Sequence, residues 1–214
     1  MTVETVDCPQ CGKPPGVCIC DRAKAVPTRL RIVILQHPQE EDALLGTAKL
    51  VAVTLPKSEI RVGLSWASLD QAIGSRNADR ERWAVLAVAK LPVPVPAEAR
   101  NEPVVVIDRK GRMRDLKHPG LDGVIVLDGT WSQAKTLWWR NAWLLKHPRI
   151  VLRPREPSIY GRLRKEPRKE WLSTLEAIGD VLPALGEDEA VRTNLRRLLR
   201  TLLQRARDRA TIPP

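Results

Sequence analysis

A carboxylate and a sharp turn follow one strongly aliphatic segment of the sequence. Residues 124–127 read Val-Ile-Val-Leu, an unbroken run typical of a strand that is buried on both faces. The run ends at Asp128-Gly129-Thr130, and a pattern of helical period begins at Trp131. Ligands bind at the carboxyl ends of strands in open α/β sheets, so Asp128 marks a candidate ligand site, whose chemistry the turn alone does not name. The alternative is an ordinary strand-to-helix turn in which Asp128 only helps to cap the helix.

Four cysteines form a second group of residues with chemical potential. They are arranged as Cys8-x-x-Cys11 and Cys18-x-Cys20, within the first twenty residues. Two close pairs of thiolates can hold Zn²⁺ tetrahedrally, and no coordination position then remains for water, so the zinc would be structural. Free or redox-active thiols are the alternative.

The segment from residue 153 to residue 170 is rich in basic residues and poor in apolar ones. Such a loop is a poor element for a core but a good contact for phosphate groups, and Tyr160 within it could stack on a base or an adenine ring. A solvated charged loop is the alternative. The candidate RNA-binding residues are Arg162, Arg164, Lys165, Arg168 and Lys169.

A helix start follows this basic segment. Ser173 and Glu176 have the spacing of a capping box, which predicts a helix from there to about Pro183. The box explains both residues as structural. A capped helix N-terminus after a basic loop is also a ready site for an anion such as a substrate carboxylate.

The elements that must position these groups alternate between strands and helices. Hydrophobic periodicity predicts strands at residues 30–36, 60–65, 83–88, 104–107, 124–127 and 149–152, and helices at 41–55, 68–73, 131–145, 173–183 and 187–209. The alternation predicts an α/β fold with a mostly parallel sheet flanked by helices. We expect residues 1–28 to form a zinc knuckle with a connector, and residues 29–214 to form one α/β catalytic domain that includes the basic C-terminal helix. In a parallel sheet, His37 and Glu40 after the first strand would lie near Asp128.

Composition narrows the classes of partner. The net charge of +11, from 36 basic and 25 acidic residues, favours a polyanion such as nucleic acid. The sequence contains neither an apolar run of about 18 residues nor a basic-then-apolar leader, so we expect a soluble, cytoplasmic protein without membrane association. Motifs for dinucleotide binding, P-loop nucleotide binding, serine hydrolysis and zinc proteolysis are absent.

Three motifs in this order resemble the DTW-domain proteins. They are the cysteine group, the Asp128-Gly129-Thr130-Trp131 signature and the segment Tyr160…Arg164-Lys165…Leu172-Ser173-Thr174-Leu175-Glu176-Ala177. The turn His37-Pro38-Gln39-Glu40 is similar to a further family motif, whereas Gly46-Thr47 replaces an expected Asn-Thr pair. The resemblance covers nearly the whole chain. It implies a tRNA-uridine aminocarboxypropyltransferase with a SPOUT-like fold that is knotted near the C-terminal half.

The resemblance also implies a reaction. S-adenosylmethionine would donate its 3-amino-3-carboxypropyl group, not its methyl group, to N3 of a uridine in tRNA, leaving 5′-methylthioadenosine. Asp128 would take the N3 proton. The donor carboxylate would face the helix start, and Arg162, Arg164 and Lys165 would neutralise that carboxylate or a tRNA phosphate. The expected donor-binding residues are Leu127, Gly129, Thr130, Trp131, Tyr160, Leu172, Ser173, Thr174 and Glu176.

Other functions are compatible with the same residues. A SPOUT-like RNA methyltransferase would use S-adenosylmethionine on a similar fold, and ribosomal RNA could be the substrate of the same transfer. A zinc-knuckle protein that binds RNA without catalysis is the alternative from a different class.

Overall fold

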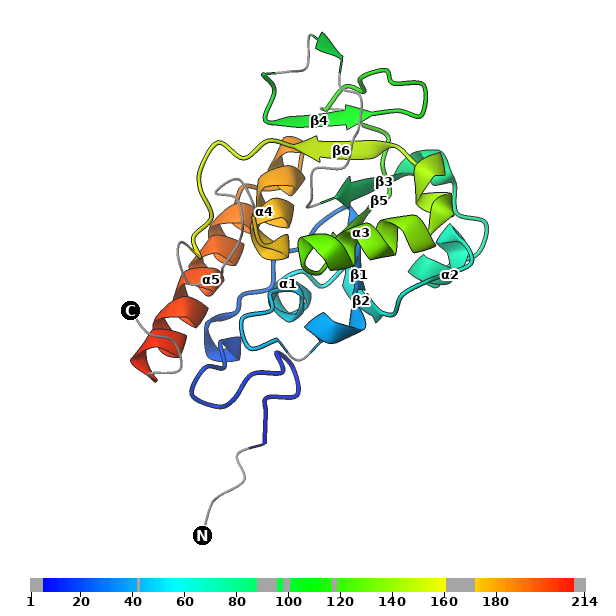
Figure 1. The fold of residues 1–214 in the computed structure, drawn as a ribbon. Helices are drawn as coiled ribbons and strands as arrows, with labels where there is room; N and C mark the ends of the chain where they lie inside the picture. Colours follow the sequence, from blue (N-terminus) through cyan, green and yellow to red (C-terminus); the bar gives the residue numbers. More distant parts are fainter. Residues whose placement is uncertain are drawn as a thin grey trace.

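A mostly parallel sheet of six strands forms the centre of the described part of the chain (Figure 1). The computed structural model describes residues 6–41, 43–87, 96–97, 101–116, 119–160 and 172–209. The strand order is β2-β1-β5-β3-β6-β4, and every neighbouring pair is parallel except β4 with β6. The strands are β1 (Arg31–Gln36), β2 (Ser58–Val62), β3 (Trp83–Ala87), β4 (Val104–Ile107), β5 (Gly123–Asp128) and β6 (Arg149–Leu152). The predicted α/β class with a mostly parallel sheet is confirmed.

Helices cover both faces of this sheet. The helices are α1 (Ala48–Thr54), α2 (Leu69–Ile73), α3 (Trp131–Arg140), α4 (Thr174–Ala184) and α5 (Ala190–Asp208). Successive side chains of a strand point to opposite faces. On β5, Val124 and Val126 belong to the core that includes α1, α4 and α5, whereas Ile125 and Leu127 belong to the core that includes α2 and α3. Burial on both faces explains why β5 reads as an unbroken aliphatic run.

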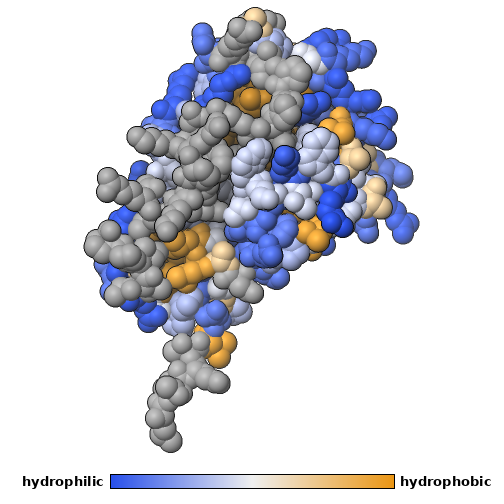
Figure 2. All heavy atoms as spheres, viewed as in Figure 1, coloured by the Kyte–Doolittle hydropathy of each residue, from blue (hydrophilic) through white to orange (hydrophobic). Residues whose placement is uncertain are grey.

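Hydrophilic side chains dominate the coloured surface in Figure 2, and hydrophobic ones show there only in small patches. Trp139 and Leu145 are among the large hydrophobic residues that stay exposed, at 66% and 46%. Within the described ranges, the longest helices are too polar to cross a lipid bilayer and the apolar ones are too short.

The helix predicted over residues 41–55 begins only at Ala48. Two backbone carbonyls before it are bonded by side chains from distant segments: Lys13 Nζ donates to Ala43 O at 2.8 Å, and Tyr160 Oη donates to Leu45 O. These bonds tie the turns before α1 to distant segments of the chain, and Ala43 O also accepts from Gly46 N at 2.8 Å within a turn.

The helix predicted over residues 131–145 ends at Arg140. Asn141 is fully buried, and its Nδ2 donates to Leu137 O at 2.7 Å and to Leu64 O at 3.1 Å. The chain then continues as a 3₁₀ helix, η5 (Ala142–Lys146), in which Leu144 is buried in place of Leu145. A polar side chain that bonds back to the helix and across to a loop is the physical reason for the early end.

Gly123, the first residue of β5, lies too close to its two neighbouring strands to accept a side chain. A Cβ atom there would lie 2.5 Å from the Trp83 ring and 2.7 Å from Arg31 O. We expect Gly123→Ala to lower the free energy of unfolding by about 1–3 kcal/mol in urea denaturation, because neither neighbour can move cheaply. Gly179→Ala is the matched control. The atom nearest to its Cβ would be Cα of Arg192 at 3.6 Å, and alanine favours the helix, so this variant should be neutral or stabilising. Equal destabilisation by both variants would contradict the crowding argument.

Candidate functional site

Strands β1 and β5 end side by side. They pair in parallel with Gln36 opposite Asp128, and the backbone N–H of His37 donates to Asp128 O at 3.0 Å. The sequence-based expectation that His37 would follow a strand ending beside Asp128 is confirmed. Asp128 is 8% exposed, so its side chain lies almost entirely out of water.

Both carboxylate oxygens of Asp128 accept hydrogen bonds. Gln36 Nε2 donates to Oδ2 at 2.7 Å, and Thr174 Oγ1 donates to Oδ1. These donors come from β1 and from the first residue of α4, so the carboxylate connects the sheet to that helix. Burial of a charged group is tolerated when donors of this kind replace its water.

The amide of Gln36 leaves one acceptor without a partner. Because a carboxylate only accepts hydrogen bonds, the nitrogen of the amide must face Asp128, and Oε1 must point away. Gln36 is 2% exposed, and its Oε1 is buried without a hydrogen-bond partner among the described residues. Buried acceptors are nearly always satisfied in folded proteins, so this oxygen is a candidate contact for a donor group on a ligand.

The turn between β5 and α3 requires glycine. Gly129 has φ +154°, and a Cβ there would lie 2.8 Å from Cβ of Gln133. Thr130 and Gln133 form a capping box at the start of α3, and Gln133 Nε2 also donates to Gln39 Oε1 at 3.2 Å. The turn after β1 and the turn after β5 are therefore tied together beside Asp128. Trp131, the next residue, is half-buried.

A second buried carboxylate fixes the start of α4. Glu176 is fully buried and accepts from Ser173 N at 3.0 Å and Ser173 Oγ at 2.7 Å, as the predicted capping box requires. It also accepts from Ser158 Oγ at 2.8 Å and Ile159 N at 2.6 Å. One side chain therefore both caps α4 and holds the loop that precedes it in the chain.

The helix start is already hydrogen-bonded at two of its backbone N–H groups. Glu176 N donates to Ser173 Oγ at 3.2 Å, and Leu175 N donates to Thr47 Oγ1 at 3.4 Å. These two N–H groups are therefore not free to bind a donor carboxylate, as the prediction for this helix start would require. The other predicted donor-binding residues here, Leu172 and Thr174, are buried.

Tyr160 packs in the core. It is 2% exposed, and its hydroxyl donates to Leu45 O. The expectation that its ring is available to stack on a base or an adenine ring is therefore wrong for this structure. The predicted RNA-binding residues Arg162, Arg164, Lys165, Arg168 and Lys169 lie outside the described residues.

The four cysteines converge as the sequence predicts. Their sulfur atoms all lie within 4.8 Å of one another, with Cys8 Sγ and Cys20 Sγ 3.7 Å apart and Cys11 Sγ and Cys18 Sγ 3.6 Å apart. Sulfur atoms at tetrahedral positions around Zn²⁺ would be separated by about 3.8 Å, given a zinc–sulfur distance of about 2.3 Å. The cluster could therefore hold a metal ion.

Backbone hydrogen bonds and burial shift the pKa values of these thiols in opposite directions. The N–H groups of Cys11 and Gln10 stabilise the thiolate of Cys8 and lower its pKa to about 6. Burial raises the pKa of Cys18 and of Cys20.

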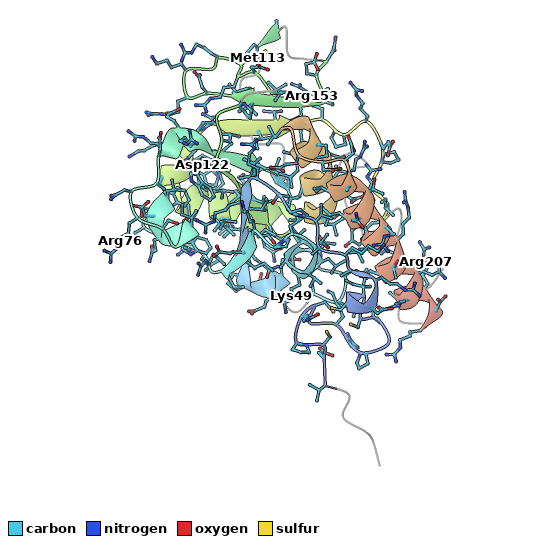
Figure 3. The ribbon with its side chains drawn as sticks, turned by 180° about the vertical axis from the view of Figure 1, so that it is seen from behind. Lys49, Arg76, Met113, Asp122, Arg153 and Arg207 are labelled. Carbon is cyan, nitrogen blue, oxygen red and sulfur yellow. The ribbon has the colours of Figure 1, made fainter. Side chains whose placement is uncertain are left out.

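Basic side chains join the cysteine loop to the rest of the chain. Lys13 is 3% exposed, donates to Ala43 O, and has its pKa lowered to about 8 by burial. Arg205 of α5 donates to Cys18 O. The amine of Lys49, a residue labelled in Figure 3, would lie 2.7 Å from a Cβ atom at Gly12. The loop is thus held by contacts from α5, from α1 and from the turn before α1.

Three contributors to the site follow from contacts that the sequence analysis missed. The sequence patterns identify Gln36 only as the last residue of a strand, Thr47 only as part of a departure from a family motif, and Thr174 only as a donor-binding residue. The parallel order of β1 and β5 is the signal that could have found Gln36, because it brings the two strand ends together.

Known proteins resemble this chain over most of its length. The family model described as "DTW domain" matches residues 5–207. A protein of Macaca fascicularis named "tRNA-uridine aminocarboxypropyltransferase 2" is 30% identical over 201 residues, which cover 92% of this chain and 62% of that protein. "tRNA-uridine aminocarboxypropyltransferase A" of Arabidopsis thaliana is 27% identical over 204 residues, covering 85% of this chain and 73% of that protein.

The relatives differ from this chain in length. The chain spans 62% of the Macaca fascicularis protein and 62% of a similar Mus musculus protein. No solved structure matches the chain. Because the family model covers nearly all of its residues, including the cysteine cluster, the β5–α3 turn and the start of α4, the chain belongs to the DTW domain family.

Proposed function

We propose that this protein transfers the 3-amino-3-carboxypropyl group of S-adenosylmethionine to N3 of a uridine in tRNA and releases 5′-methylthioadenosine. The names of the relatives support the reaction and the substrate class. The observation that carries the proposal is the buried Asp128 carboxylate at the end of β5, held on both oxygens beside the unpartnered Oε1 of Gln36.

Asp128 acts as the base in this proposal. Each carboxylate oxygen has two lone pairs, so Asp128 can accept a proton while Gln36 and Thr174 remain bonded to it. The uridine N3 proton passes to the carboxylate, N3 forms a bond to carbon, and the carbon–sulfur bond breaks with its electron pair left on sulfur. Gln36 and Thr174 hold the carboxylate in one orientation, which lowers the entropic cost of the transfer.

The residues around Asp128 suit a cationic donor. S-adenosylmethionine supplies an electrophilic carbon next to a sulfonium, and it carries an ammonium group. Gln36 Oε1 is an acceptor that fits an N–H group of this ammonium. Leu127, Gly129, Thr130 and Trp131 of the β5–α3 turn, together with Thr174, would hold the donor next to them.

The cysteine cluster has a structural role in this proposal. Four sulfur ligands saturate a tetrahedral Zn²⁺ ion, so the ion would stabilise residues 1–28 and take no part in the reaction. Residues 29–214 would form the catalytic domain in the cytoplasm. The SPOUT-like knot implied by the resemblance remains a prediction, since residues 161–171 before α4 lie outside the described residues.

The reaction is tested by its products. Purified protein is incubated with S-adenosylmethionine and unmodified tRNA, and the digested nucleosides are analysed by mass spectrometry. We expect a uridine that carries the aminocarboxypropyl group, together with 5′-methylthioadenosine. A methylated nucleoside with S-adenosylhomocysteine would overturn the chemistry and favour a methyltransferase.

Asp128→Asn tests the base. The substitution keeps the shape of the side chain, so the fold and S-adenosylmethionine binding should persist, while transfer should fall by about 10²–10⁴-fold because the amide cannot take the proton. Asp122→Asn is the matched control, since Asp122 (Figure 3) precedes the opposite end of β5 and is half-exposed in an ion pair with Arg82. Single-turnover rates and calorimetric donor binding separate chemistry from binding. Full transfer by Asp128→Asn would end the base assignment.

Cys11→Ser tests the zinc proposal. Wild-type protein should hold about one Zn²⁺ per chain, and the variant should lose tight zinc binding and melt at a lower temperature, because one of four ligands is gone. Metal analysis and thermal melting measure the two effects. Val17→Ala serves as the control: it shortens a buried side chain of the same loop, so it should lower the melting temperature but keep the zinc. A full equivalent of zinc in Cys11→Ser would contradict the assignment.

A further inference from the structure

A groove with basic walls runs along α5, and Asp128 is not among the residues that line it. It has a volume of about 610 Å³, and Arg22 of the 3₁₀ helix η1 (Cys20–Arg22) forms one side of it. The α5 residues that line it are Arg197, Arg200, Thr201, Gln204, Arg205 and Asp208. We call this feature the α5 groove.

The α5 side of the groove is one continuous helix face. Residues 197, 200, 201, 204, 205 and 208 recur at three- and four-residue spacing, which places them on one side of the helix. The face extends for about 16 Å at a rise of 1.5 Å per residue. The groove is thus elongated along the helix axis.

The two sides of the groove are bonded to each other. Arg197 Nη2 donates to Arg22 O at 2.9 Å, and Arg205 makes two hydrogen bonds to the carboxylate of Asp21, at 2.8 Å and 2.7 Å. Arg205 also donates to Cys18 O. These bonds fix the connector against α5, so the groove is built into the fold.

The remaining charge in the groove is positive. Four arginines and one carboxylate, that of Asp208, line the groove. The nearby carboxylate of Asp21 forms an ion pair with Arg205. Arg200 is exposed and forms no hydrogen bond or ion pair with another described residue. Its charge interacts with that of Glu156 only through a longer-range electrostatic attraction. The Arg22 side chain is 63% exposed, and its Nε lies 3.3 Å from Asp21 Oδ2, so Arg22 and Arg205 share one carboxylate and keep a net positive charge. The guanidinium group of Arg200 is open to an anionic partner.

We propose that the α5 groove binds the phosphate backbone of the substrate RNA, an inference that rests on the proposed function. Guanidinium groups pair with phosphate oxygens in a bidentate manner, and an elongated row of them suits a strand with regularly spaced phosphates. The net charge of +11 favours the same partner.

The groove is also connected to the catalytic edge. Arg205 holds Cys18, Lys13 of the same loop holds Ala43, and Thr47 after that turn bonds the start of α4. Thr174 at this start bonds Asp128. An RNA strand bound in the groove would therefore contact a part of the protein that is joined by hydrogen bonds to the start of α4, which bonds Asp128.

Arg200→Glu and the double variant Arg22→Glu/Arg200→Glu test the groove. Binding of unmodified, transcribed tRNA to the full chain is measured across a range of salt concentrations. We expect about tenfold weaker binding for each reversed arginine, and a salt slope smaller by about one for each lost phosphate contact. Arg76→Glu is the matched control, because Arg76 is exposed, makes no hydrogen bond or ion pair with another described residue and lies on another side of the molecule from Arg207 of α5 (Figure 3). It carries the same change in net charge and should leave binding within about twofold.

The outcomes separate the two proposals. Donor binding should be unchanged in all three variants, which shows that they are folded. If wild-type protein modifies tRNA and Arg200→Glu binds it as tightly as Arg76→Glu does, the groove proposal is wrong and the proposed function stands. If wild-type protein neither binds nor modifies tRNA, the proposed function fails. Competition by polyaspartate as strong as that by tRNA would overturn the assignment to RNA in favour of an acidic protein.

Discussion

The buried carboxylate of Asp128 connects the sheet to helix α4. Burying an ion without partners is costly, so Asp128 keeps its place only while Gln36 and Thr174 both donate to it. This requirement fixes the register of β1 against β5, because a slip by one residue would turn Gln36 to the other face of the sheet. It also fixes the first residue of α4 above the strand ends. The geometry of the candidate site is therefore set by two hydrogen bonds to one side chain.

Glu176 is a second buried carboxylate in the same region, and it has a different structural role. Glu176 satisfies the cap of α4 and two donors from the loop at Ser158 and Ile159. Asp128 positions α4 relative to the sheet, whereas Glu176 positions the preceding loop relative to α4. Removing either acid would leave buried donors without acceptors, and in both cases the start of α4 would be destabilised. The start of α4 is thus the point at which strand, loop and helix are aligned.

Local patterns predicted the sheet well, because the core strands are buried on both faces and read as aliphatic runs. Strands β4 and β6 lie where periodicity placed them, and the capping boxes at Thr130 and Ser173 mark true helix starts. The strand predicted over residues 60–65 lies instead at Ser58–Val62. The cysteine cluster was also predictable, since its ligands are close in sequence.

The failures have long-range causes. Lys13 and Tyr160 bond carbonyls of the turns that replace the first part of the helix predicted over residues 41–55, and each comes from a distant part of the chain. Gln36 and Asp128 are separated by 92 residues, so their contact follows from topology and not from any motif. Tyr160 looked like a surface residue because its neighbours in sequence are charged, whereas its ring packs in the core.

The contacts between the cysteine loop and α5 bear on how the chain matures. Cys18 and Asp21 bond Arg205, which follows them by 187 and 184 residues, and Leu30 N bonds Glu187 across 157 residues. Val17 and Ile19 lie in the same core as Leu198 and Leu202. During synthesis the ribosome makes residues 17–21 long before their partners, so this apolar surface stays uncovered until α5 has emerged. Early capture of a metal ion by the four thiols would order the loop in the meantime, which would couple metal supply to the yield of folded protein.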